Sequence, residues 1–270
     1  MWNTGCSCLA RLPSTQAKNQ SKPGELLLMP LRHLADNVWL WPSDPDVNIV
    51  QPNMGVIIGQ QETVLVDAGH GPGIARQVST TLAEMGAPPV KRIIYTHHHW
   101  DHVFGAYGYP EEITAVAHTQ CRMYLQTMSQ QTWTPAILRD KIEQNPNLKL
   151  AYTSEDWQNF HIILPTHTFD STTTLTLDRT TTIQLQHVGG RHAADSIIVH
   201  LVEAGIAFLG DCYYPGLSAE DAATIDFAML QSLLELPCQT YIDGHKPPYT
   251  RRQLDRIVRA QSLLGRLQKK

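Results

Sequence analysis

The sequence contains neither a long apolar run nor a long basic run. No apolar stretch approaches the roughly 20 residues of a transmembrane helix, and the first residues, MWNTGCSCLARL, lack the charged start and continuous apolar core of a secretory signal. No basic run exceeds two or three residues, and 21 Lys and Arg against 25 Asp and Glu give a formal net charge of −4. These absences argue against a membrane or nucleic-acid partner and favour a small-molecule substrate.

Cysteine is also scarce. Its five copies are scattered and odd in number, so we expect no disulfide framework and a reducing, cytoplasmic compartment; they are Cys6, Cys8, Cys121, Cys212 and Cys238. Residues 1–24 contain basic residues but no acid, and they are rich in Ser, Thr, Gln and Asn. That composition is compatible with an organelle transit peptide, but a disordered tail is the interpretation that we favour.

Residues 25–270 are expected to form a single domain. A chain of 270 residues with 42% hydrophobic content is within the size of one layered domain, and no internal repeat or linker divides it. The apolar runs NVWLW, MGVIIG and TVLVDAG follow one another without helices, which predicts an antiparallel or mixed sheet. A helix is expected in residues 71–86, where Ile74, Val78 and Leu82 recur at four-residue spacing and Gly86 offers a stop. Strands are then expected at 91–96 and 112–118.

Residues 119–170 differ in character from the predicted sheet. Prolines at 135 and 146 are expected to interrupt helices here, and the segment also contains several large apolar and aromatic side chains. We therefore predict a helical insertion or lid that is not part of a sheet. This segment could line an apolar substrate pocket or form a small core of its own, with Tyr124, Met128, Trp133 and Trp157.

The second half returns to short strands. Strict alternation in residues 174–190 predicts a hairpin that turns near Asp178 and Arg179, and strands follow at 195–201, 206–211 and 240–245. Two helical patterns, starting at Ser218 and Thr250, close the chain. The order predicts an α/β fold: a four-layer αββα sandwich of two mixed sheets with helices on the outer faces.

The stretch THHHWDH, residues 96–102, is the strongest chemical signal. Imidazole nitrogens and carboxylate oxygens suit a borderline-soft cation such as zinc, and closely spaced ligands converge only where a loop curls around the ion. His97, His99, Asp101 and His102 meet this requirement directly after the predicted strand RIIYT, where site loops of α/β proteins lie. The stretch therefore predicts a metal site, with His98 as a solvated bystander.

Three further ligand-type residues follow apolar strands downstream. His192 lies in GGRHAADS, Asp211 in FLGDC and His245 in YIDGH, each near a glycine that permits a tight turn. Arg191 is expected to pair with Asp195 or with a substrate carboxylate. Seven ligands suffice for two metal ions, whereas a structural site needs only four. This surplus argues against a non-catalytic protein that uses metal only for stability.

The pattern H-x-H-x-D-H followed by a lone His, a Gly-Asp and a Gly-His resembles the metallo-β-lactamase superfamily, over roughly residues 30–260. The resemblance implies that Asp67, in LVDAG, supports the metal-binding loop through backbone hydrogen bonds. It also implies two half-sites and one shared ligand: His97, His99 and His192 for one ion, Asp101, His102 and His245 for the other, and Asp211 as the bridge.

The chemistry implied by the resemblance is that of a dinuclear metal-dependent hydrolase. Two zinc ions are expected, with iron or a mixed pair as the alternative. A hydroxide between the ions would attack a lactone, lactam or thioester carbonyl, because a metal lowers the pKa of bound water from 15.7 to about 7. Asp101 could orient this nucleophile while it binds metal.

The bridging aspartate resembles the lactonase, glyoxalase II, sulfur dioxygenase and phosphodiesterase branches. One branch of the zinc β-lactamases instead has cysteine at the position of Asp211, and Cys212 is one residue late for that role. Acyl-homoserine lactonases place a tyrosine three residues after the aspartate, here Tyr214, where it donates a hydrogen bond to the substrate carbonyl. Two alternatives stay open: a mononuclear iron sulfur dioxygenase that oxidises a persulfide, using mainly His97, His99 and an additional ligand, and a true β-lactamase.

Overall fold

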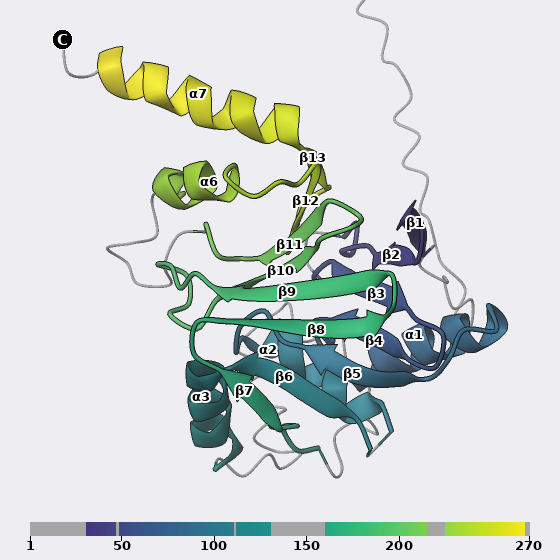
Figure 1. Ribbon diagram of the computed structural model, residues 1–270. Helices are drawn as coiled ribbons and strands as arrows, with labels where there is room; N and C mark the ends of the chain where they lie inside the picture. Colours follow the sequence, from purple (N-terminus) through teal and green to yellow (C-terminus); the bar gives the residue numbers. More distant parts are fainter. Residues whose placement is uncertain (1–30, 47–48, 111, 131–159, 215–224, 268–270) are drawn as a thin grey trace, which may run out of the picture.

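The computed structural model describes residues 31–46, 49–110, 112–130, 160–214 and 225–267. Two mixed sheets pack face to face, and helices lie on their outer sides (Figure 1). The predicted αββα sandwich is therefore confirmed. The N-terminal residues 1–30, with Cys6 and Cys8, lie outside the described residues, so the expected tail stays a prediction.

The first sheet has seven strands in sequence order. Its antiparallel part consists of β1 (Arg32–Ala35), β2 (Val38–Trp41), β3 (Met54–Ile58) and β4 (Thr63–Val66). Its parallel part continues with β5 (Val90–Ile94), β6 (Thr114–His118) and β7 (His167–Phe169). The helices of this half are α1 (Pro72–Glu84), α2 (Trp100–Val103), the 3₁₀ helix η1 (Phe104–Gly108) and α3 (Thr119–Ser129).

The second sheet has six strands in the order β13-β12-β11-β10-β9-β8. These are β8 (Thr172–Asp178), β9 (Thr181–His187), β10 (Ile197–Leu201), β11 (Ile206–Gly210), β12 (Thr240–Asp243) and β13 (Tyr249–Thr250). Only β11 and β12 pair in parallel; the other pairs are antiparallel. Figure 1 shows α6 (Phe227–Leu233) and α7 (Arg251–Leu267) over the outer face of this sheet.

Alternating side chains build the core in layers. Val56 of β3 faces the helical side, where it packs with residues of α1, whereas the next residue, Ile57, faces the second sheet. The inter-sheet layer also contains Phe208 of β11, which lies so close to Gly55 that a Cβ there would meet its ring at 2.7 Å. The period of two in the sequence therefore assigns each strand residue to one of two apolar layers.

The predicted helix ends are confirmed for α1. Pro72 occupies the first turn, where its missing N–H costs no hydrogen bond, and Gly86 follows the helix with a φ of +66°, which favours glycine. The buried residues of α1 include Ile74, Val78 and Leu82, as their spacing predicts. None of the helices in the described ranges is long and apolar enough to span a membrane.

One expectation about residues 119–170 is wrong, and another is tested only in part. Residues 167–169 are not outside the sheet, because β7 pairs with β6 as the edge strand of the first sheet. This strand is short and its side chains are partly exposed, so it has no apolar pattern. The segment does begin with a helix, α3, but residues 131–159, with Trp133 and Trp157, lie outside the described residues.

The C-terminal helices agree with the prediction in part. α7 starts directly after Thr250, as expected. Ser218 lies outside the described residues, and the described helix α6 begins after Asp226, whose carboxylate accepts a hydrogen bond from Met229 N at 2.9 Å. This cap satisfies one of the N–H groups that a helix start leaves without a partner.

Candidate metal centre

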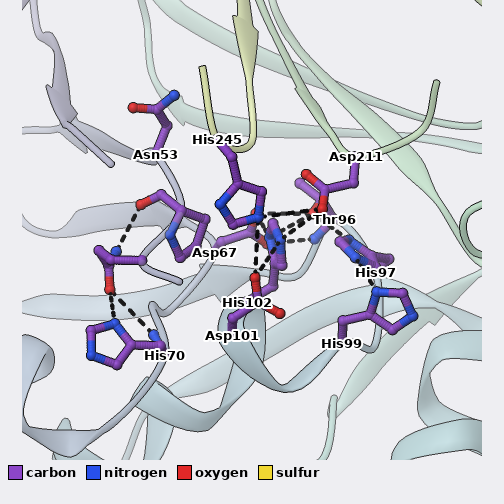
Figure 2. A network of polar contacts seen from close by, with 12 residues as sticks. Asn53, Asp67, His70, Thr96, His97, His99, Asp101, His102, Asp211 and His245 are labelled. Carbon is purple, nitrogen blue, oxygen red and sulfur yellow. Dashed lines mark hydrogen bonds and ion pairs between the residues drawn. The ribbon is translucent and has the colours of Figure 1, made fainter. Parts of the chain in front are cut away.

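The predicted ligands come together at one edge of the sandwich. Figure 2 labels all of them except His192. Strands β4 and β5 are parallel, as are β11 and β12, so the residues that follow them leave the two sheets at the same edge. The amide of Ile197 donates to Thr96 O at 2.9 Å and joins the two sheets there. The site is therefore built from loops that two rigid sheets hold in place.

The first group consists of three histidines. The ligand atoms of His97, His99 and His192 all lie within 4.8 Å of one another, and His97 Nε2 is 3.0 Å from His99 Nδ1. His97 is fully buried, and His99 and His192 are partly buried. These are the three residues that the resemblance assigns to one ion.

The second group consists of one aspartate and two histidines. Asp101 Oδ2 lies 3.4 Å from His102 Nε2 and 3.2 Å from His245 Nε2. α2 begins at Trp100, and therefore places Asp101 and His102 on its first turn, directly after the histidine cluster. These residues, too, match one of the two expected half-sites.

Asp211 lies between the two groups. Its Oδ2 is 3.4 Å from His192 Nε2, 3.6 Å from His102 Nε2 and 3.4 Å from His245 Nε2. Its other oxygen is packed against Gly244, where a Cβ would stand 2.0 Å from Oδ1. Only a glycine fits beside Asp211, which explains why glycine precedes His245 in the sequence.

The donor set fits a metal cation. Imidazole nitrogens and carboxylate oxygens converge, and within the described part of the chain His102 Nε2 and Asp211 Oδ1 are buried without a hydrogen bond. A buried polar atom without a hydrogen bond is unfavourable, and a cation at this point would satisfy it. The arrangement is compatible with metal binding, and the ligand role of each residue stays a prediction.

Asp67 supports the histidine cluster from β4. Its Oδ1 accepts a hydrogen bond from Thr96 N at 2.7 Å, and its Oδ2 accepts from Thr96 Oγ1 at 2.9 Å and faces His102 Nδ1 at 2.7 Å. A proton on Nδ1 of His102 leaves the lone pair of Nε2 for a metal. Asp67 adopts a φ of +64°, which is uncommon for a residue with a Cβ and indicates that its position is constrained by these bonds.

Burial and charge set the protonation of the ligands. Burial lowers the pKa of His97 well below its usual value and that of His99 to about 4. Burial alone would raise the pKa of Asp211, but His102 and His245 hold it well below the usual range. Burial would lower the pKa of His245, yet Asp101 and Asp211 raise it to about 9. The site thus holds ionised carboxylates beside histidines.

His98 is not simply solvated, contrary to expectation. Its Nδ1 lies 2.8 Å from Asp195 Oδ1, and Asp195 is fully buried. Arg191 does not pair with Asp195; its Nε lies 4.0 Å from Asp226 Oδ2. The physical reason is burial. The carboxylate of Asp195 is fully buried and needs a hydrogen-bond donor that reaches it, and His98 is less exposed than Arg191, at 23% against 54% of the side chain.

Tyr214 lies beside the site, but its hydroxyl has a partner. The ring centroid is 5.9 Å from that of His192 and 6.3 Å from that of His245. The hydroxyl donates to Asp243 Oδ1 at 2.5 Å, and Tyr213 donates to the other oxygen of the same carboxylate. Contact between Tyr214 and a substrate stays a prediction.

Part of the expected lid can be placed. Tyr124 of α3 is 38% exposed, and its ring centroid lies 4.6 Å from that of His98. Met128 packs against the core on the helical side of the first sheet. α3 thus brings one aromatic side chain next to the histidine cluster, whereas Met128 contributes to the core.

Several polar residues around the site were not singled out from the sequence. His70 follows LVDAG directly and packs against Gln51. Its burial lowers its pKa to about 4. Asn53 and Asp243 hold the loop of His245 and lie 190 positions apart in the chain. The position of His70 after an expected metal-site motif was a usable signal, but the pairing of Asn53 with Asp243 has no local signature.

Comparisons with known proteins identify the family and the fold of this chain. The sequence model of the metallo-beta-lactamase superfamily matches residues 47–252. Two solved structures have a similar fold: a metallo-beta-lactamase from Pontibacter korlensis, 18% identical with a TM-score of 0.59, covering 85% of this chain and 96% of that one, and a metallo beta lactamase from Hirschia baltica, 16% identical with a TM-score of 0.57, covering 85% and 95%. A comparison with curated proteins gave no match. The family match spans β3 to β13 and all seven candidate ligands, and the chain therefore belongs to the metallo-β-lactamase superfamily.

Proposed function

We propose that the chain is a dinuclear metal-dependent hydrolase that opens a lactone, lactam or thioester of a small molecule at its carbonyl. The position of Asp211 carries this proposal, because its Oδ2 is 3.4 Å from His192 of the first group and 3.4 Å from His245 of the second. One oxygen so placed suits a ligand that two ions share. Membership in a superfamily of mostly metal-dependent hydrolases, which typically bind zinc, supports the same function. A cytoplasmic location stays a prediction.

Two bound ions would polarise the substrate carbonyl and lower the pKa of a water molecule from 15.7 to about 7, which provides a nucleophile at neutral pH. Asp101 is suited to orient that water, because it is buried and ionised: burial opposes ionisation, but His102 and His245 lower its pKa. Tyr214 would donate to the substrate carbonyl after its hydroxyl leaves Asp243. Burial raises the pKa of its phenol well above the usual range, so the hydroxyl keeps the proton that it would donate.

The state of Cys212 bears on the branch of the family. Its thiol is fully buried, and burial together with Asp211 raises its pKa far above the usual range. Cys212 packs in the apolar cluster of α6 and α7 on the second sheet, and it belongs to none of the convergent groups found among the described residues. This supports the branches with a bridging aspartate over the β-lactamases that use a cysteine.

A second candidate function is a mononuclear iron sulfur dioxygenase. His97, His102 and Asp211 form a third convergent group in which all three ligands are buried. Two histidines and one carboxylate are the ligand set of many non-haem iron oxygenases. This group favours the second candidate if only one ion is bound.

Metal analysis of the purified protein separates these candidates, together with a screen of lactone, lactam, thioester and persulfide substrates. Two equivalents of metal and hydrolysis of a carbonyl substrate are expected. His99→Ala and Asp211→Ala should each lower that hydrolysis about 100-fold or more. The control is His33→Ala, since the exposed side chain of His33 bonds Asp36 O in the turn that follows it and is not a candidate ligand. Full activity after loss of either ligand would contradict the hydrolase, and one iron per chain with oxygen consumption would support the dioxygenase.

A further inference from the structure

The loop that carries His245 is held from inside by Asp243. The Oδ1 of Asp243 accepts hydrogen bonds from the backbone amides of His245 and Lys246, each at 2.8 Å. The same carboxylate accepts from the hydroxyls of Tyr213 and Tyr214. These bonds turn the chain sharply after β12, but all of them arise within the second sheet and its loops. They do not determine where the loop lies relative to the ligands of the first sheet.

Asn53 provides that link from the first sheet. It lies directly before β3, and its Nδ2 donates to Asp243 O and Lys246 O, each at 2.7 Å. Its backbone amide donates to Gly244 O at 2.6 Å. The carbonyls of residues 243, 244 and 246, on both sides of His245, are thus bonded to a single residue of the opposite sheet. Figure 2 shows Asn53 beside the ribbon that carries His245.

The chemistry of this position requires an amide side chain. The Oδ1 of Asn53 accepts from Ser43 N at 2.8 Å, which orients the NH₂ group toward the two carbonyls. An aspartate would place a carboxylate oxygen against both carbonyls, and an alanine would leave them without donors. Asn53 is only 5% exposed, so water cannot easily replace the lost bonds.

We propose that Asn53 is a positioning residue for the second metal ion: it holds His245 within reach of Asp101 and Asp211 by fixing the carbonyls on both sides of it. The proposal rests on the proposed two-ion site. Residues that orient a metal ligand typically contribute 10- to 100-fold to metal affinity. Loss of Asn53 should therefore weaken the ion held by Asp101, His102 and His245, and leave the ion of His97, His99 and His192 in place.

The chain offers a matched control in Asn37. Its Nδ2 likewise donates to two acceptors that join the sheets, Ile58 O at 3.1 Å and Thr181 Oγ1 at 3.0 Å. Asn37 lies in the β1–β2 turn, and its acceptors lie at the end of β3 and the start of β9. The candidate metal ligands instead follow the ends of β5, β9, β11 and β12. Replacing either asparagine should lower the free energy of unfolding, but only the replacement of Asn53 should weaken metal binding.

The experiment is a competition titration of metal-free protein with zinc and a chromophoric chelator. It compares the wild type with Asn53→Ala, Asn53→Asp, Asn37→Ala and Asn37→Asp, and the alanine variants avoid a buried charge. We expect two binding steps in the wild type, with one step weakened about 10- to 100-fold by the Asn53 variants and both steps kept within about twofold by the Asn37 variants. Excess zinc should restore the second equivalent in Asn53→Ala.

The outcomes distinguish this proposal from the proposed function. Wild-type protein that binds fewer than two equivalents would overturn both. Two equivalents in the wild type with unchanged affinities in Asn53→Ala would overturn the role of Asn53 and leave the dinuclear site intact. Equal weakening of both steps, or the same change in Asn37→Ala, would also overturn it, because the effect would then be one of stability and not of position.

Discussion

Replacing His70 with asparagine should remove a pH-dependent loss of stability from the metal-free protein. His70 is 7% exposed, and its Nδ1 donates to the Oε1 of Gln51, whose amide nitrogen is engaged with Pro52 O at 2.7 Å. Burial lowers the pKa of His70 from 6.5 to about 4, and the charge of Asp101 offsets this only in part. An asparagine amide could make the same bond to Gln51 without a titrating group.

The sign and size of the effect follow from the two pKa values. The unfolded chain takes up a proton on His70 as the pH falls through 6.5, but the folded chain does so only near 4, so the folded state loses stability between these values. The two protonation curves give a loss of about 2 kcal/mol between about pH 7.5 and pH 5, and of about 3 kcal/mol below about pH 4. Above neutral pH the contribution is absent.

Urea unfolding in the presence of a chelator, at both pH values, measures this loss. Other histidines also titrate, so the quantity that matters is the difference between wild type and His70→Asn, in which their contributions cancel. The wild type should lose about 2 kcal/mol more than His70→Asn. His33→Asn, at a mostly exposed position, serves as the control and should behave like the wild type. An equal loss in wild type and His70→Asn would refute the reasoning.

Three further predictions concern single contacts. Asp67→Asn should weaken metal binding about 10- to 100-fold in a chelator competition assay, because His102 loses the acceptor that orients it. Gly244→Ala should reduce the bound metal below two equivalents by metal analysis, since its Cβ would stand 2.0 Å from Asp211 Oδ1. Gly105→Ala should lower the free energy of unfolding by about 1–3 kcal/mol in urea, because its Cβ would stand 1.9 Å from Ala68 O; Gly73→Ala, whose Cβ would meet nothing closer than 3.7 Å, should not.

The convergence of the candidate ligands could be predicted from the sequence because they lie at or beyond the ends of strands with an apolar pattern. Thr96 and His97 come after β5, and Asp211 after β11, so the order of the strands alone brings them to one edge. The period of two also predicted the layers, since Val56 and Ile57 face different cores. Such patterns predict the structure reliably because side chains alternate between the two faces in every strand of a sheet.

β7 and the pair of His98 with Asp195 could not be predicted in the same way. The strand of His167–Phe169 has too few residues for a pattern, and only the exposed edge of β6 turns it into part of the sheet. His98 and Asp195 are 97 positions apart, and their bond depends on how the loops of the two sheets fold over each other. A contact between two loops so far apart in the chain cannot be predicted from residue types or from their spacing.

The sequence by itself determined the fold class, the order of most strands along the chain and the set of seven candidate ligands, because these depend on periodicity and on residue chemistry at strand ends. Only the tertiary structure decided which polar side chains support the ligands. The resemblance already implied the support by Asp67, but Asn53, which bonds the loop of His245 across the two sheets, and Asp195, which faces His98, were found only in the structure. Such contacts depend on the packing of distant segments to within a hydrogen-bond length, which no local pattern encodes.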